Sequence, residues 1–504
     1  MSVRQVTLVG AGPGGIGLLT IRGLEILRAA DVVLYDRFVS DDILAEIPVS
    51  AEKFDVGKRA GSHPVPQDEI NNILLEKARQ GKNVVRLKGG DPLVFARGGE
   101  ELELLAENGI PFEIVPGVTS ALAAAAYAGI PLTHREYASS FHVITTHAKN
   151  NEKPDIDFDA LAKLNGTLVF LMGAAAIGDI CEGCVSAGMD RYMSAAIVEN
   201  AAANSQRKFL GTLATLPEIA RANNVKSPAV VIIGKVCQFS DRYDWFSRKP
   251  LRNKRVIVAR VKHESSKLSD SLRELGCDVV EIPCLRIAPL IGAGCMLGEK
   301  LADIKNYSWL VFTSGAGVNV FFDYLIGNEI DIRELRHLKI ACVGIETKKE
   351  VSKRGIKTDY IPAEYNGAAL ARGLAERVKN GERLFIARAK NADKDLTRIL
   401  AEAGAAFDDV PIYEKIKEVK NGAAANVITG NDFDFAAFTS PSAVECFAEA
   451  AARNQLCKIK AVCIAEKTAA AARAYGMETH ISAEATVMSV VEKIKELSAP
   501  ARIS

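Results

Sequence analysis

Short runs of β-branched and other apolar residues alternate with helical stretches from the N-terminus onward. The runs "VTLVGAG", "DVVLYD", "NVVRLKGG" and "PFEIVPG" are separated by stretches such as "LLTIRGLEILRAA" and "QDEINNILLEKARQ". An alternation of strands and helices indicates a largely parallel sheet with helices on its faces. The sequence therefore predicts an α/β fold.

A second set of strand-like runs, "SFHVITTH", "GTLVFLMG", "SAAIVEN" and "SPAVVIIGKV", follows the turn "GIPLTHREY". We therefore expect the first half to have two α/β lobes, at about residues 1–132 and 133–246. The periodicity then stops at "DRYDWFSRKPLRNKR", where aromatic, basic and proline residues cluster. This break in composition predicts a linker over residues 247–254.

The second half contains an internal repeat. "WLVFTSGAGVNVFF" resembles "FAAFTSPSAVECF", and "IACVGIETKKEVSKRG" resembles "AVCIAEKTAAAARAYG", in the same order along the chain. The period of roughly 125 residues is far too long for a solenoid unit. The repeat predicts two similar α/β lobes within residues 255–496, followed by a tail over residues 497–504.

Composition excludes several classes of protein. Apolar residues make up 48 % and charged residues 25 % of the chain, the proportions of a soluble globular protein. A formal net charge of +1 predicts no general attraction to nucleic acid or to an anionic membrane. The longest apolar runs have strand length, and "MSVRQ" is not a secretory signal, so we expect a cytoplasmic protein.

Ten cysteines are scattered along the chain, and a disulfide framework is not expected in a large protein without an export signal. Cys181 and Cys184 in "CEGC" have the spacing of a zinc or redox pair, but no second pair lies nearby in the sequence. The sequence favours buried thiols, and no metal is expected.

The N-terminal segment "VTLVGAGPGGIGLLT" contains the pattern G-x-G-x-x-G at Gly10, Gly12 and Gly15. Asp36 follows about twenty residues on, where a dinucleotide-binding fold has its ribose-binding acid. A nicotinamide dehydrogenase is therefore one hypothesis. Pro13 weakens it, because proline removes an N–H from the turn that would face the pyrophosphate.

The segment "VVRLKGGDPLVFARGGEE" is a second glycine-rich loop, but it lacks the G-K-[ST] ending of a P-loop. Asp91 would also repel a phosphate beside it. A carboxylate at this place suits a cationic ligand, and S-adenosylmethionine carries a sulfonium and an amino group. The alternative is a helix-entry turn in which Asp91 is a simple cap.

These motifs occur together with "YDRFVSDDIL", "VGKRAGSHPVPQDEIN", "VPGVTSALAAAAYAGIPLTHR" and "VFLMG". In this order they resemble the uroporphyrinogen-III C-methyltransferases over residues 1–246. The resemblance implies two α/β lobes, S-adenosylmethionine in the cleft between them, and usually a homodimer. It also implies methylation of C2 and C7 of uroporphyrinogen III to precorrin-2, which feeds sirohaem or cobalamin.

The same resemblance implies roles for single residues. Asp36 matches the proposed proton acceptor, Lys58 its partner acid and Arg97 an arginine on the tetrapyrrole side. Asp36 could instead cap a turn, and Lys58 could bind a substrate carboxylate. This chain departs from the family at Gly15, where an Asp is usual. The positions that match the surroundings of S-adenosylmethionine are Pro13, Gly89, Gly90, Asp91, Val94, Thr119, Ser120, Met172 and Ala201, the last of which is often Gly.

Residues 255–496 resemble the uroporphyrinogen-III synthases through "VFTSGAGV", "DYIPAEYNGAALA", "VPIYEK" and "FTSPSAVECF". The resemblance implies a pair of doubly wound parallel-sheet lobes that close hydroxymethylbilane with inversion of ring D. Tyr413 matches a tyrosine implicated in departure of the hydroxyl, and the alternative is an aromatic that packs at a hinge. Hydroxyl residues at strand-to-helix turns could bind substrate carboxylates or be N-caps: Thr313, Ser314, Thr347, Thr439, Ser440, Ser442 and Thr468.

The two implied reactions are consecutive, since the product of the synthase is the substrate of the methyltransferase. We therefore expect a bifunctional enzyme of tetrapyrrole biosynthesis, with tetrapyrroles as its partners and no nucleic acid or membrane. A short linker would hold the two sites at high effective concentration, which favours transfer of the intermediate. The alternatives are a methyltransferase of a later corrin intermediate and a second half that only binds tetrapyrroles.

Overall fold

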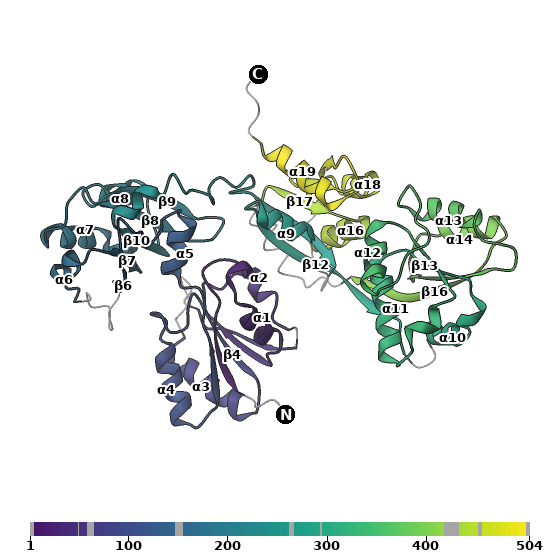
Figure 1. The fold of residues 1–504 in the computed structure, drawn as a ribbon, viewed down its shortest axis with the longest axis horizontal. Helices are drawn as coiled ribbons and strands as arrows, with labels where there is room; N and C mark the ends of the chain where they lie inside the picture. The colour runs from purple at the N-terminus through teal and green to yellow at the C-terminus, as the bar shows by residue number, and fades with distance from the viewer. Residues whose placement is uncertain are drawn as a thin grey trace, which may run out of the picture. The chain divides into compact units, whose positions relative to one another are not determined.

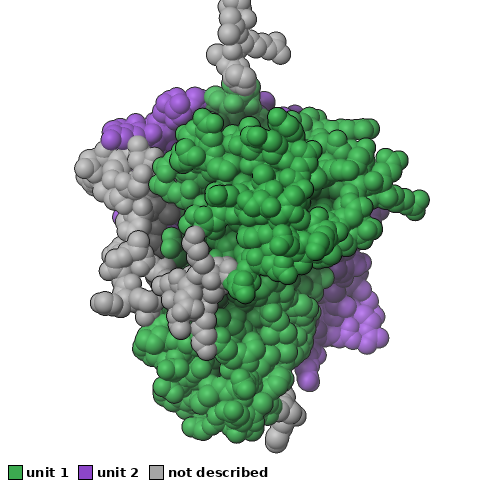
Figure 2. Space-filling model, turned by 90° about the vertical axis from the view of Figure 1, so that its left-hand side faces the viewer, with its two compact units in different colours: residues 1–256, 268–281, 494–504 green, residues 257–267, 282–493 purple. Residues whose placement is uncertain are grey.

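The computed structural model describes residues 5–48, 50–57, 65–146, 155–261, 267–292, 295–417, 433–451 and 456–499. The chain forms two compact units (Figure 2). The first comprises Met1–Val256, Leu268–Glu281 and Ile494–Ser504, and the second comprises Ile257–Lys267 and Ile282–Lys493. The domain limits expected from the sequence stay predictions.

The first unit begins with a five-stranded sheet of order β3-β2-β4-β1-β5, in which every pair is parallel. The two central strands, β1 and β4, are buried at every residue, as expected for a sheet covered on both faces. The predicted parallel sheet is thus confirmed. The strands are β1 (Val6–Gly10), β2 (Val32–Tyr35), β3 (Glu52–Asp55), β4 (Val84–Lys88) and β5 (Phe112–Val115).

Helices cover both faces of this sheet (Figure 1). Leu27 of α1 (Ile21–Arg28) and Ile43 of α2 (Asp41–Leu44) pack with Val9 and Leu87 on one face. Residues of α3 (Gln67–Arg79) and α4 (Gly98–Glu107) pack on the other. The sequence of α3 explains why it forms, since buried residues recur at Ile70 and Leu74 and acidic residues occupy its first turn.

A second sheet in the same unit has the order β6-β7-β10-β8-β9. Only β6 and β7 are parallel, because β10 runs antiparallel to β7 and β8, and β9 antiparallel to β8. Strand β9 was absent from the runs identified in the sequence. The strands are β6 (Phe141–Thr145), β7 (Thr167–Leu171), β8 (Ser194–Glu199), β9 (Arg207–Thr212) and β10 (Ala229–Ile233).

One face of the second sheet packs on the alanine-rich helix α5 (Ser120–Tyr127), whose small side chains allow close approach. The other face packs on α6 (Phe158–Lys163), α7 (Ile177–Ser186) and α8 (Leu216–Ala222). Each lobe of the first unit therefore has its own covered sheet, as the sequence predicted.

The rest of the chain builds a nine-stranded sheet of order β14-β13-β15-β16-β12-β11-β17-β18-β19. The predicted repeat is present on its two sides: each has a strand, a Ser-capped helix, a second strand and a second helix. The long strands β12 and β16 pair antiparallel between the two sides. The sequence did not predict that the lobes share one sheet. The strands are β11 (Arg255–Val261), β12 (Asp278–Pro289), β13 (Trp309–Phe312), β14 (Lys339–Cys342), β15 (Arg383–Ala389), β16 (Ala406–Lys417), β17 (Phe435–Phe438), β18 (Lys460–Cys463) and β19 (Glu478–Ile481).

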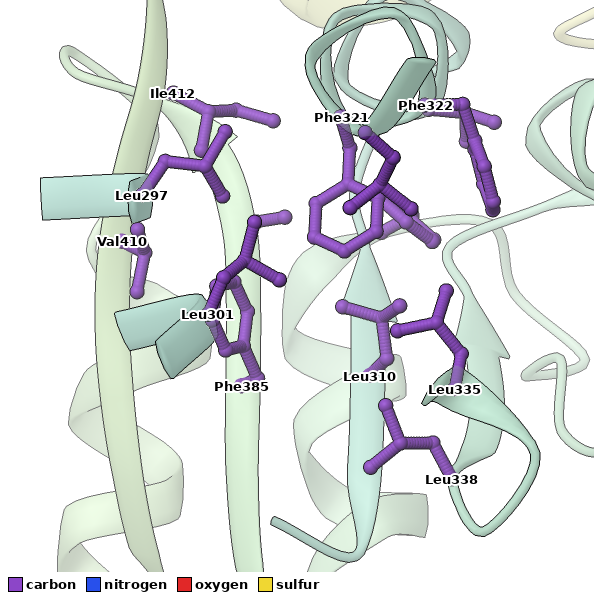
Figure 3. Close-up of a cluster of buried hydrophobic side chains, with 14 of the residues drawn as sticks. Leu297, Leu301, Leu310, Phe321, Phe322, Leu335, Leu338, Phe385, Val410 and Ile412 are labelled. Carbon is purple, nitrogen blue, oxygen red and sulfur yellow. The ribbon is translucent and has the colours of Figure 1, made fainter. Parts of the chain in front are cut away.

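Phe321 and Phe385 lie in the main apolar core of the second unit, with leucines from neighbouring elements (Figure 3). The rings of Phe312, Phe321 and Phe385 meet edge to face. The helices of this half are α9 (Lys267–Glu274), α10 (Met296–Ala302), α11 (Gly315–Gly327), α12 (Ile345–Lys353), α13 (Gly367–Ala375), α14 (Asp395–Glu402), α16 (Pro441–Ala450), α18 (Glu466–Ala474) and α19 (Val487–Ser498).

Replacing Phe321 by alanine is expected to destabilise the second unit by about 3–5 kcal/mol, because a fully buried ring is lost. Ile326→Ala on the same helix is the matched control, since Ile326 is 67 % exposed, and its effect should stay within about 0.5 kcal/mol. Denaturant unfolding followed by the fluorescence of Trp309, in a Trp245→Phe background, measures both. Equal stability of the two variants would contradict this core assignment.

Candidate active sites

The two glycine-rich loops pair with each other at the carboxyl ends of β1 and β4. Gly12 N–H donates to Gly90 O at 3.1 Å, and Gly90 N–H donates to Gly12 O at 3.1 Å. A Cβ on Gly10 would lie 2.5 Å from the Cα of Gly117, and one on Gly117 would lie 2.2 Å from Gly90 O. The loops therefore meet backbone to backbone, at a distance that only glycine permits.

Asp91 ties this junction together. Its Oδ1 accepts from Leu93 N–H at 2.8 Å, and its Oδ2 accepts from Gly117 N–H at 3.0 Å. The carboxylate thus closes its own turn and bonds a neighbouring loop, but it does not cap a helix, because α4 begins at Gly98 with Arg97 as its N-cap. Contact of Asp91 with a cationic ligand stays a prediction.

The predicted cofactor positions around the junction share an open side. A Cβ on Gly89 would meet only the Phe38 side chain, at 3.4 Å, and one on Gly90 would meet Ser120 N at 3.8 Å and Thr119 Cα at 4.0 Å. Thr119 is the N-cap of α5, and its hydroxyl accepts from a backbone N–H of the first turn. Partly exposed backbone and hydroxyl groups therefore converge beside the glycine pair.

Backbone strain concentrates in the same loops. Eight non-glycine residues have positive φ in the described ranges, and five of them are Phe95, Arg97, Met172, Asn200 and Ala202. Such conformations cost roughly 1–3 kcal/mol each and persist where the surrounding structure enforces them, often at functional sites. The strain therefore indicates functional loops after β4, β7 and β8.

The two lobes of the first unit touch at these loops. A Cβ on Gly14 would lie 2.9 Å from Ala202 O, so the turn that contains Pro13 contacts the loop that contains Ala201. The methyl group of Ala201 packs against the apolar cluster below α5. Two predicted cofactor positions from different lobes, Pro13 and Ala201, are thus brought close together.

A carboxylate from another residue, Asp42, lies beside Gly15. Asp42 Oδ2 lies 2.9 Å from the place where a Cβ of Gly15 would be, and it accepts from Ile16 N–H at 2.8 Å. Asp42 therefore supplies negative charge at the point where the resemblance predicted that a carboxylate is lost.

Asp36 directly follows β2 and forms an ion pair with Arg86 of the adjacent strand β4. Arg86 Nη2 lies 2.6 Å from Asp36 Oδ1, and the Asp36 side chain is 30 % exposed whereas Arg86 is 3 % exposed. Burial opposes the charge on Arg86, but the carboxylates of Asp36 and Glu101 outweigh it and raise the pKa of Arg86. A buried cation thus orients a carboxylate that can still reach a ligand.

Glu101 completes a buried network behind this pair. Its carboxylate, which is fully buried, accepts from Arg86 Nε at 3.0 Å, from Lys88 Nζ at 3.0 Å and from Gln67 Nε2 at 3.2 Å. Burial, followed by the charge of Arg86, lowers the pKa of Lys88 in spite of Glu101. The network connects β4, α3 and α4 directly below the glycine junction.

The remaining predicted residues of the first unit differ in accessibility. Arg97 is exposed at the start of α4 and forms a two-point ion pair with Glu100, at 3.0 and 2.8 Å. Val94 and Met172 are also exposed. Lys58 lies outside the described residues.

Tyr413 in the second unit is 2 % exposed and belongs to the main apolar core. Its hydroxyl lies 2.8 Å from Ser314 Oγ, and Ser314 caps α11 by accepting from Gly317 N–H. Ser440 caps α16 in the same way, and Thr347 and Thr468 are buried in the first turns of their helices. The structure thus assigns capping or packing contacts to these residues, while a contact with substrate stays a prediction for all the hydroxyl residues named above.

Cys181 and Cys184 lie buried in α7, where burial raises the pKa of the two thiols to about 12 and about 11. In the part of the chain that the structure describes, no group of three or more His, Cys, Asp or Glu residues is arranged to hold a metal ion. No helix in the described ranges is both long enough and apolar enough to span a bilayer.

Comparison with known proteins assigns both halves of the chain. Residues 5–217 match the family model of the tetrapyrrole (corrin/porphyrin) methylases, and residues 266–492 match that of uroporphyrinogen-III synthase HemD. The porphyrin biosynthesis protein HemD of Ruminiclostridium josui is 46 % identical over 494 residues, which cover 98 % of each chain. The chain belongs to this family. It is a bifunctional enzyme of tetrapyrrole biosynthesis, with a methylase half followed by a synthase half.

Other relatives match one half only. The siroheme synthase of Escherichia coli (strain UTI89 / UPEC) is 53 % identical over 243 residues. The match covers 52 % of that relative, so this chain spans about half of its length. A solved uroporphyrin-III C-methyl transferase from Thermus thermophilus, complexed with S-adenyl homocysteine, is 40 % identical and covers 46 % of this chain and 99 % of its own, with a TM-score of 0.41. A mutant uroporphyrinogen III synthase from the same bacterial species is 16 % identical and covers 48 % of this chain and 98 % of its own, with a TM-score of 0.36.

Four residues of the buried network in the methylase half were not predicted from the sequence: Arg86, Lys88, Glu101 and Gln67. A usable signal was present, because Arg86 and Lys88 lie two residues apart in a strand that is otherwise apolar. Such residues point to the same face, and buried cations require a carboxylate partner. The identity of that partner depends on tertiary structure.

Glu101→Gln should destabilise the first unit by about 3–5 kcal/mol, because it leaves buried cations without their shared carboxylate. The loss should shrink as the pH is raised, since the lowered pKa of Lys88 lets the buried ammonium give up its proton. Glu100→Gln, at the exposed neighbour, is the control and should change stability by no more than about 0.5 kcal/mol. Denaturant unfolding followed by Trp245, in a Trp309→Phe background, provides the measurement, and equal stabilities would refute the role of the network.

Proposed function

We propose that the synthase half cyclises hydroxymethylbilane to uroporphyrinogen III, and that the methylase half methylates this product at C2 and C7 to give precorrin-2. The consecutive order of the two family matches in one chain supports the pairing of these reactions. The observation that carries the methylase assignment is the glycine junction, where open backbone, strained loops and the Asp36–Arg86 pair converge. Supply of sirohaem or cobalamin, and a cytoplasmic location, stay predictions.

The residues at the junction fit S-adenosylmethionine. The open side of Gly89 and Gly90 leaves room for a ligand close to the backbone, and Asp91 and Asp42 provide negative charge near a cationic ligand. When bound, S-adenosylmethionine would supply an electrophilic methyl group. The residues that would hold it are Pro13, Gly89, Gly90, Asp91, Val94, Thr119, Ser120, Met172 and Ala201.

Asp36 is the residue that we assign to proton removal from the methylated macrocycle. Its carboxylate is partly exposed, and its Oδ1 lies 2.6 Å from the guanidinium of Arg86. Glu101 in turn fixes that guanidinium through a second ion pair. A base must be oriented towards the proton that it accepts, and this chain of contacts provides the orientation. The predicted partner acid, Lys58, lies outside the described residues.

The macrocycle would lie beside the loop that follows β4. Arg97 offers an exposed guanidinium for a substrate carboxylate, with Glu100 as the partner that it would exchange. Phe38, Leu93 and Phe95 are exposed apolar side chains in the loops after β2 and β4, and they suit the flat faces of a tetrapyrrole. We also propose a homodimer through the methylase half.

A coupled assay tests the proposed function. Hydroxymethylbilane and S-adenosylmethionine are supplied together, and precorrin-2 is followed by absorbance and mass. Accumulation of uroporphyrinogen I would mean that the synthase half is inactive. Accumulation of uroporphyrinogen III, or of a corrin methylated elsewhere, would refute the methylase assignment.

Asp36→Asn should keep S-adenosylmethionine binding but lower methylase turnover by about 10²-fold or more, because an amide cannot accept the proton. Asp91→Ala should instead weaken binding, since the loop at residues 89–91 loses its hydrogen bond to Gly117 N–H. Titration calorimetry and single-turnover kinetics separate the two effects. The reverse pattern would show that these roles are misassigned.

Tyr413→Phe keeps the buried ring and removes only the hydroxyl bonded to Ser314. If the hydroxyl assists the synthase reaction, turnover should fall at least about tenfold while stability changes by no more than about 1.5 kcal/mol. Unchanged turnover would leave Tyr413 as a packing residue. Methylase activity of the same variant is the internal control.

A further inference from the structure

The segment that joins the two activities is folded. Leu251 is fully buried, and backbone hydrogen bonds run from Arg252 N–H to Lys249 O and from Lys254 N–H to Leu251 O, both at 3.1 Å. Asn253 has a φ of 63°. A flexible tether needs none of these features, so the linker over residues 247–254 has a fixed conformation within the first unit.

Three consecutive linker residues bind the loop after β8. Arg252 Nη1 donates to Asn204 Oδ1 at 3.0 Å, and Arg252 Nη2 donates to Gln206 O at 2.6 Å. Asn253 N–H donates to the same Asn204 oxygen at 3.1 Å, and Asn204 Nδ2 donates to Lys254 O at 3.1 Å. The guanidinium of Arg252 also lies over the ring of Phe246, at 4.5 Å from the ring centroid. The contact is therefore two-sided and specific in geometry.

The loop that receives these bonds is the strained loop of the methylase half. Asn200 and Ala202 both have positive φ, and Ala202 N–H donates to Gln206 Oε1 at 2.8 Å. Gln206 is buried and also donates from Nε2 to Tyr127 O at 3.1 Å. Arg252 thus bonds the backbone of Gln206, whose side chain in turn bonds the strained turn at Ala202.

The opposite side of this turn contacts the glycine loop of the other lobe. Ala202 O lies 2.9 Å from the place of a Gly14 Cβ, next to Pro13, and Ala201 is its neighbour. A continuous series of contacts therefore runs from Arg252 through Gln206 and Ala202 to the predicted cofactor residues Pro13 and Ala201.

The linker also forms backbone hydrogen bonds with the start of the synthase half. Lys254 O accepts from Asp278 N–H at 2.8 Å as well as from Asn204, and Leu251 N–H donates to Leu275 O at 2.9 Å. Leu275 and Asp278 fall within the residues that match the synthase family, and they belong to the first compact unit. One backbone carbonyl thus joins a methylase loop to a synthase strand.

We propose that Arg252 and Asn204 are positioning residues for the cofactor-facing loop 200–206, so that the connection between the two enzymes is part of the methylase site. This inference rests on the proposed function, because it assumes that the loop faces S-adenosylmethionine. Without the linker contacts the strained turn relaxes, and Ala201 and Ala202 lose the positions in which they meet the glycine loop. A segment anchored in the synthase half thereby sets the affinity of the methylase half for its methyl donor.

The test uses the full-length chain with Arg252→Ala and Asn204→Ala. Each variant should weaken binding of S-adenosylhomocysteine by about tenfold or more. Arg252→Ala removes the hydrogen bonds of a charged guanidinium, and Asn204→Ala removes an amide oxygen that accepts two hydrogen bonds. The KM for S-adenosylmethionine should rise similarly, while kcat of the methylase and turnover of the synthase change less than about twofold. Amide hydrogen exchange of residues 200–206 in the ligand-free protein should become faster.

Arg248→Ala is the matched control, because Arg248 belongs to the same linker but donates to Asp241 O. It should bind S-adenosylhomocysteine like the wild type. In a double-mutant cycle, Arg252→Ala and Asn204→Ala should be non-additive, because both remove the hydrogen bond between Arg252 and Asn204. Asn253→Gly, which tolerates positive φ and keeps the N–H, should retain wild-type affinity.

Wild-type affinity in both Arg252→Ala and Asn204→Ala, with unchanged exchange of residues 200–206, would overturn the inference. So would a loss of affinity that is matched by Arg248→Ala. If the wild type itself fails to bind S-adenosylhomocysteine or to form precorrin-2, the proposed function fails instead, so the two failures are distinguishable.

Discussion

The reciprocal hydrogen bonds between Gly12 and Gly90 join the loops that follow the two central strands of the first sheet. They require both loops to approach without side chains, and they bring Gly117 and the start of α5 against the same point. Parallel strands deliver their carboxyl ends to one edge of a sheet, which is where α/β proteins bind ligands. The junction therefore fixes where a cofactor, the strained loops and Asp36 can meet.

A buried charge network supports that edge from below. Arg86 and Lys88 lose solvation in the sheet, and Glu101 and Asp36 compensate for it with short ion pairs. Of the four charged side chains in this network, only Asp36 is partly exposed, so the network ends in a carboxylate at the surface of the proposed site. Stability alone does not require such a network. Burying these charges costs desolvation free energy, and well-packed apolar residues would stabilise the fold as well. In the proposed function, the network orients Asp36 beside the glycine junction.

Local patterns predicted most of the fold. The alternating runs correctly predicted β1, β2, β4 and β5, and the internal repeat correctly predicted two similar lobes in the second half. Strand β9 was missed because "RKFLGT" carries charge and glycine, and the antiparallel pairing of β12 with β16 depends on contacts far apart in sequence. The glycine loops were recognised from their composition, whereas the partners of Asp91, Asp36 and Tyr413 are tertiary contacts that no local pattern encodes. For the same reason, the break in composition near Ser247 indicated a simple linker, although Arg252 and Asn253 bind Asn204.

The loops at residues 10–15, 89–91, 117–120 and 200–206 are proposed to form one binding site for the methyl donor. Hydrogen exchange of the full-length protein, measured by mass spectrometry with and without S-adenosylhomocysteine, tests it most directly. Exchange should become slower on binding in peptides from all four loops and should change little in the second unit. Saturating binding that leaves these four loops unprotected, or that protects only segments elsewhere, would contradict it.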